Sequence, residues 1–160
     1  MTKKRKMVKD MIKREVIILN ENYGEYTLKL LNTELRYDIQ FNGKNSDNGW
    51  KLSIIGKSLE DSIDVFKRLH SWLTLKNISH KSATKKRVEY DHYEQSKKVM
   101  TIYVPNDMDH KKLAHKIEII LSGYKGWEDI KLPFKSYEHY SNAIFFRNDR
   151  NENGKYIPAN

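Results

Sequence analysis

The chain has 160 residues, with 30 Lys and Arg against 21 Asp and Glu for a net charge of +9, and no Cys. That length accommodates one domain with a core, and the lack of Cys excludes disulfide frameworks, thiolate zinc sites and cysteine nucleophiles. Ten Tyr, five Phe and three Trp are too many for a disordered chain. No apolar run approaches the roughly 20 residues that span a bilayer, so we expect a cytoplasmic protein without membrane contact.

Two segments carry the positive charge. Residues 1–14 hold seven basic residues and one acidic residue, and residues 76–98 hold seven basic and three acidic residues. We predict that residues 1–15 form a basic arm with weak helical character. The arm and a second basic run together predict a basic contact surface made of Lys3, Lys4, Arg5, Lys6, Lys85, Lys86 and Arg87.

A β-hairpin is predicted for the amino-terminal part, residues 16–48. Alternation of polar and apolar side chains at 26–31 and 35–41 is typical of strands, and the polar residues between them supply a turn. A loop rich in Asn, Asp and Gly follows at 42–49 and separates this hairpin from the rest.

Six elements are predicted between residues 49 and 147, followed by a polar tail at 148–160. Ser58 with Asp61 indicates the start of a helix, and Gly123 indicates the end of another. Periodicity predicts strands at 50–55, 78–84, 98–104 and 142–147, helices at 59–76 and 109–122, and a polar loop at 85–95. The order βαββαβ predicts an α+β fold with a split, ferredoxin-like antiparallel sheet and two helices on one face.

Four cations lie on or beside different predicted strands: Lys51, Lys81, Lys98 and Arg147. Strand alternation places Lys51 and Ser53 on the face away from the helices, and it allows Lys81 and Arg147 to share that face or its rim. Converging cations repel one another unless an anion joins them, and phosphate suits both Arg and Lys. A merely solvated polar face is the plainer interpretation, and it stays open here.

The histidines do not predict a metal site. His110 and His115 are five residues apart, so they do not share one helical face. His80, His92 and His139 fall in separate segments without carboxylate ligands at a recognised spacing. We therefore interpret them as surface or loop residues and expect no metal and no cofactor.

RNA-recognition modules share the βαββαβ order, and they stack bases on aromatic side chains of the first and third strands. Here Trp50 lies at the edge of the first strand, and Tyr103 is the single aromatic residue of the third. A sequence-specific RNA module is therefore disfavoured. Non-specific nucleic-acid binding through the basic arm stays a second alternative.

Four short segments resemble a known family in their order along the chain. They are GWKLS at 49–53, HK at 80–81, QSKKVMTIY at 95–103 and FFR at 145–147. They resemble the segments GWKIHVS, FK, SGKFITIYP and YYRYG of the amino-terminal lyase-like domain of class III lanthipeptide synthetases. The likeness to phosphothreonine lyases among type III effectors is more remote.

The resemblance implies elimination of phosphate from phosphoserine or phosphothreonine. Lys81 matches the family's base, while Lys51, Lys98 and Arg147 match its phosphate-binding cations. The family's acid histidine falls on Ser53, and a loop arginine falls on Tyr93. Because a serine hydroxyl is a poor general acid near neutral pH, efficient elimination is in doubt. The kinase and cyclase regions of the synthetases are absent from this sequence.

These departures favour binding over catalysis. We predict a non-catalytic binding or inhibitor protein on a lyase-like fold, of the kind that phages and mobile elements encode, anti-CRISPR proteins among them. Its partner would be a host protein with an acidic face. The alternative is a phosphoserine or phosphothreonine lyase, or a phosphopeptide-binding domain.

Overall fold

The computed structural model describes residues 38–44, 48–90, 97–128 and 137–158. These residues form an α+β fold built on one antiparallel sheet of strand order β1-β3-β4-β2-β6-β5. The strands are β1 (Ile39–Phe41), β2 (Trp50–Ile55), β3 (His80–Ser82), β4 (Lys98–Tyr103), β5 (Glu138–Ser141) and β6 (Ile144–Asn148). The helices are α2 (Leu59–Leu75), α3 (Lys85–Tyr90) and α4 (His110–Ile120). The predicted α+β class is confirmed.

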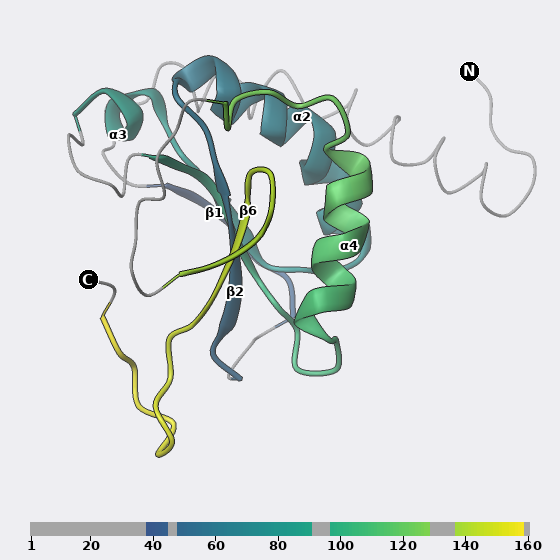
Figure 1. Ribbon diagram of the computed structural model, residues 1–160, viewed down its shortest axis with the longest axis vertical. Helices are drawn as coiled ribbons and strands as arrows, with labels where there is room; N and C mark the ends of the chain where they lie inside the picture. The colour runs from purple at the N-terminus through teal and green to yellow at the C-terminus, as the bar shows by residue number, and fades with distance from the viewer. Residues whose placement is uncertain (1–37, 45–47, 91–96, 129–136, 159–160) are drawn as a thin grey trace, which may run out of the picture.

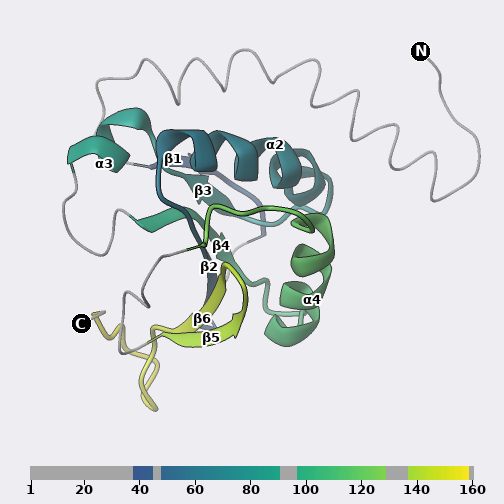
Figure 2. The ribbon, with the colours of Figure 1, turned by 45° about the horizontal axis from the view of Figure 1, so that its top comes forward.

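Helices α2 and α4 cover the same face of the sheet (Figures 1 and 2). Ser58 caps α2, because its hydroxyl accepts a hydrogen bond from the Asp61 amide at 3.3 Å, as the spacing predicts. Asp109 caps α4 in the same way, accepting from the Lys112 amide at 3.0 Å. None of the described helices is long and apolar enough to cross a lipid bilayer.

The face of the sheet under α2 and α4 forms the hydrophobic core. The register aligns Leu52 of β2 with Ile102 of β4 on one side and with Phe146 of β6 on the other, and all three side chains are buried. Val65 and Leu69 of α2 pack onto this layer. The residues between these core positions must then point to the opposite side of the sheet.

Three elements differ from the sequence-based expectation. A helix, α3, occupies the start of the predicted polar loop, because the Thr84 hydroxyl accepts from the Arg87 amide at 3.2 Å and caps it. Strand β5 was not expected, because Glu138–Ser141 shows no apolar alternation. Strand β1 pairs with β3, whereas most of the hairpin predicted for residues 16–48 lies outside the described residues.

His80 corrects the interpretation of the histidines as surface or loop residues. Its register partner on β4 is Ile102, a core residue, so its ring points toward α2 and is buried. There His80 Nε2 lies 3.0 Å from Nδ1 of the equally buried His70. Burial lowers the pKa of His70 to about 3 and the pKa of His80 to about 4, so both rings are neutral at pH 7.

The buried His70–His80 pair makes the free energy of unfolding depend on pH. The unfolded chain takes up protons on both rings below about pH 6.5, whereas the folded chain takes them up only near pH 4 and below. Stability is therefore fully present above pH 6.5 and falls as the pH drops, by up to about 1.4 kcal/mol per pH unit for each histidine. Urea unfolding between pH 7 and pH 5 measures this slope.

Replacing the exposed His115 with Gln is the matched control for that slope, because its ring lies on the surface of α4. We expect the His115→Gln variant still to lose stability between pH 7 and pH 5, because the buried pair is unchanged. A free energy of unfolding that stays constant from pH 7 to pH 5 would contradict the neutral buried pair.

Candidate anion-binding site

The four cations predicted from the sequence lie together on the face of the sheet opposite α2 and α4, here called the second face. Lys51 of β2 pairs across the sheet with Arg147 of β6, and Lys81 of β3 pairs with Thr101 of β4. Lys98 lies opposite Ile55, where the register between β2 and β4 shifts. We call Lys51, Lys81, Lys98 and Arg147 the cation cluster.

Lys98 is the most perturbed member of the cluster, with a side chain only 8% exposed. Its ammonium donates a hydrogen bond to the Tyr137 hydroxyl at 3.1 Å and lies 5.5 Å from the centre of that ring. Burial, followed by repulsion from Lys51 and other nearby cations, lowers the pKa of Lys98 to about 7. A large fraction of Lys98 is therefore a neutral amine at physiological pH.

Arg147 is buried at 3% exposure and has one guanidinium nitrogen without a partner. Its Nη2 donates to the Ile157 carbonyl, while Nη1 finds no hydrogen-bond acceptor. The guanidinium carbon lies 5.9 Å from the centre of the Tyr137 ring and 5.8 Å from that of Tyr156, so two aromatic rings flank the charge. One strong, buried donor is therefore left without an acceptor.

Lys51 has a carboxylate partner, Asp149. Its ammonium lies 3.3 Å from Asp149 Oδ2, and both side chains are largely buried. Burial lowers the pKa of Lys51 despite this partner, and Arg147 and Lys81 add to the lowering. One carboxylate therefore does not neutralise the positive charge gathered here.

Lys81 lies at the rim of the cluster. It is half-buried, and its ammonium lies 5.9 Å from the centre of the Tyr103 ring. Repulsion from Lys81 contributes to the lowered pKa of both Lys51 and Lys98, which shows that the three ammonium groups act on one another.

Two hydroxyl groups complete the second face beside the cations. The Ser53 hydroxyl is buried beneath Tyr137 and touches that phenol without forming a hydrogen bond of ordinary geometry. Burial is the main cause that raises the pKa of Tyr137, so the phenol keeps its proton near neutral pH. Both hydroxyl groups are thus potential donors toward an anion.

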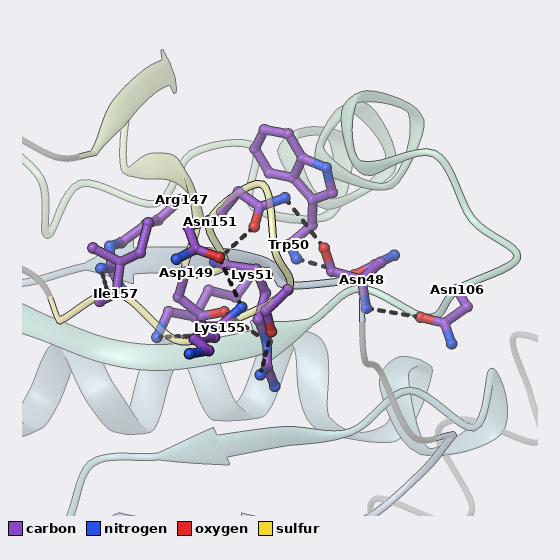
Figure 3. A network of polar contacts seen from close by, with 12 residues as sticks. Asn48, Trp50, Lys51, Asn106, Arg147, Asp149, Asn151, Lys155 and Ile157 are labelled. Atoms are coloured by element: carbon purple, nitrogen blue, oxygen red, sulfur yellow. Dashed lines mark hydrogen bonds and ion pairs between the residues drawn. The ribbon is translucent and has the colours of Figure 1, made fainter.

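The segment after β6 folds back over this region (Figure 3). Residues 149–157, part of the predicted polar tail, form a turn in which the Ile157 amide donates to the Asp149 carbonyl. This turn supplies both the carboxylate that pairs with Lys51 and the carbonyl that accepts from Arg147. Gly49 lies beneath it at φ 83°, where a Cβ would collide with the Asn148 side chain.

The predicted basic contact surface is divided by the structure. Lys85 is exposed on α3, and Lys86 is half-buried beside it. Arg87 is a correction, because its guanidinium lies 2.8 Å from Asp38 and donates to the Lys98 carbonyl, which fixes β1 and β4 together. The other predicted members, Lys3, Lys4, Arg5 and Lys6, lie outside the described residues.

Sequence reasoning missed Tyr137, Asp149 and the Ile157 carbonyl. Tyr137 belongs to a stretch rich in Tyr and Lys, where nothing in the sequence distinguishes it from its neighbours. Tyr93 and His92 lie outside the described residues. Within the described part of the chain, no group of three His, Asp or Glu side chains could hold a metal ion.

Comparison with known proteins does not identify a family for this chain. No family model matches the sequence, and no curated protein matches it significantly. The chemistry of the site therefore rests on its own geometry, which offers cations and hydroxyl donors to a compact anion.

Lys98 is expected to lose its proton near pH 7. Nitrogen-15 NMR of the lysine side chains, recorded from pH 5 to pH 10, measures this titration directly. Tyr137→Phe removes the oxygen that accepts from the Lys98 ammonium, so it should lower the Lys98 pKa further. An ammonium signal of Lys98 that persists unchanged above about pH 9 would show that burial does not act as described.

Proposed function

We propose that the second face binds the phosphate group of a phosphorylated Ser or Thr in a peptide or protein. The observation that carries this proposal is the convergence of the cation cluster around two buried groups without hydrogen-bond partners, Ser53 Oγ and Arg147 Nη1. A buried polar group without a partner costs about 1–3 kcal/mol. A ligand that brings several acceptor oxygens to one point removes that cost.

Phosphate fits this arrangement better than a carboxylate does. It carries close to two negative charges and three strong acceptor oxygens near neutral pH. Because Lys98 and Arg147 are buried, their charge is weakly screened, and a dianion gains more from them than a monoanion. Binding should also raise the pKa of Lys98, which restores its full positive charge.

A protein with a broad acidic face is a weaker candidate for this site. The side chains of Lys98, Arg147 and Lys51 are largely buried, so a flat partner reaches mainly the half-buried Lys81. Inhibition of a host protein, as by the anti-CRISPR proteins of phages and mobile elements, stays a prediction. An inhibitor of that kind needs a contact surface other than the cation cluster.

Elimination of phosphate is the second candidate function, supported by the neutral amine of Lys98, which would act in place of Lys81, the base that the resemblance implies. In that reaction the amine would take the α-proton of phosphothreonine, and the electrons of the Cα–H bond would form a Cα=Cβ double bond. The Cβ–O bond would break, and phosphate would leave with its electrons. A group must then protonate the leaving phosphate. Ser53 and Tyr137 are poor acids near neutral pH. Of the two histidines near enough in sequence to replace them, His80 faces α2 and His92 lies outside the described residues. Binding without turnover is therefore the primary proposal.

A phosphothreonine peptide should bind at least about 10-fold more tightly than its unphosphorylated form, as measured by calorimetry. Lys98→Met keeps most of the apolar side chain while removing the charge, so it should abolish this preference. Lys125→Met is the matched control, because Lys125 is an exposed lysine that does not belong to the cation cluster. Equal affinity for both peptides would sink the proposal, and a dehydroamino acid seen by mass spectrometry would make the protein a lyase.

Asp149→Asn tests whether the tail carboxylate competes with the ligand. Removing its charge leaves Lys51 without its partner, so the affinity for the phosphothreonine peptide should rise several-fold. Asp107→Asn is the control, because that carboxylate pairs with Lys44 away from the cluster. An unchanged or weaker affinity in Asp149→Asn would mean that the carboxylate positions Lys51 and does not compete.

A further inference from the structure

A groove lies between α2 and α4, on the opposite face of the sheet from the cation cluster. The two helices run antiparallel, since Lys76 at the end of α2 and Asp109 at the start of α4 line the same groove. Near the other end, Arg68 of α2 donates to the Ser122 carbonyl just past α4 at 2.9 Å. The groove has a volume of about 470 Å³, within the roughly 300–1,000 Å³ typical of ligand sites.

The floor of this groove is apolar. It is made by the Trp72 indole of α2, the Met108 side chain before α4 and Leu113 of α4. Trp72 and Met108 pack against the core but are only partly buried. The floor therefore suits one or two apolar side chains of a partner.

The rim of the groove carries an excess of positive charge. Lys76, Lys112 and Lys116 line it, and none of them forms an ion pair with the described carboxylates. The two acidic residues that also line it are already engaged. Asp107 pairs with Lys44 at 2.6 Å, and Asp109 accepts from the Lys112 amide.

The exposed side of α4 extends this surface. Lys112, Lys116 and Ile119 follow one another at spacings of four and three residues, so they form one stripe along the helix. Ile119 is 61% exposed, the most exposed of the large hydrophobic side chains that the structure describes. Ile119 thus places an exposed apolar side chain within one turn of Lys116, just beyond the groove.

We propose that this groove is a docking site for an acidic segment of a partner protein, in which apolar side chains are flanked by Asp or Glu. The apolar residues would lie on Trp72, Met108 and Leu113, and the carboxylates would lie opposite the three rim lysines. A peptide can carry its carboxylates at the positions opposite the lysines and apolar or neutral residues elsewhere. A nucleic acid carries a phosphate at every step, so its backbone would also meet Asp107 and Asp109. The chain's own Lys-rich start carries the wrong charge for this rim.

The test uses the full-length protein and a peptide mixture of the form Glu-Glu-Z-X-X-Z-Glu-Glu, where Z is Leu, Ile, Phe or Met and X is any residue. The chain has three Trp, so the indole N–H signals of Trp72, Trp50 and Trp127 are separate NMR reporters. We expect the peptides to shift the Trp72 signal and to leave the other two unchanged. The double variant Lys112→Glu/Lys116→Glu should weaken binding at least about 10-fold.

The control carries the same change of charge at exposed lysines outside the groove, Lys57→Glu/Lys125→Glu, and should bind like the wild type. The proposal is overturned by an unmoved Trp72 signal at about 1 mM peptide, a concentration at which weak binding is visible. Equal binding by the Lys112→Glu/Lys116→Glu variant, or tighter binding of a single-stranded oligonucleotide, would also overturn it. A Trp72 signal that moves with protein concentration alone would assign the groove to a second copy of this chain.

Discussion

The structure of the second face depends on the burial of two cations, Lys98 and Arg147. Removing a charge from water is costly, so each buried cation needs a hydrogen-bond acceptor, an aromatic ring or a shifted pKa. Lys98 has the Tyr137 hydroxyl and a pKa lowered to about 7, while Arg147 has the Ile157 carbonyl and two flanking rings. The segment at 149–157 is therefore held against the sheet by the same groups that make the face cationic.

The fold separates two kinds of polar chemistry by placing them on opposite faces of one sheet. Toward α2, the polar groups are neutral, and the His70–His80 pair is satisfied within the core at a lowered pKa. On the second face, the cations repel one another, and Ser53 and Arg147 keep buried atoms without partners. The histidine pair keeps its stabilising contacts near neutral pH. On the second face, unpaired donors and mutual repulsion between cations cost stability, and a bound anion would remove that cost.

Sequence patterns predicted much of the framework, and they failed where a partner far along the chain decided the outcome. The helical stripe and the Ser58 cap predicted α2 closely, because both signals are local. Strand β5 has no such signal and forms because β6 provides an edge to pair with. The alternation of side chains along a strand correctly placed Lys51 on the second face. The same alternation fails for Lys98, because counting from Met100 it would turn Lys98 toward the helices. The register shift between β2 and β4 accounts for the position of Lys98 beside Tyr137.

The sequence by itself determined the α+β class, the positions of the main helices and strands, and the place of Lys51 on the second face, because these depend on periodicity. Only the tertiary structure decided which groups surround the cations. Asp149 and Ile157 reach Lys51 and Arg147 because the chain turns back after β6, and His80 is withdrawn from the second face because its strand aligns it with Ile102. Burial, and with it the pKa of Lys98, is set by such contacts between distant segments, which no local pattern encodes.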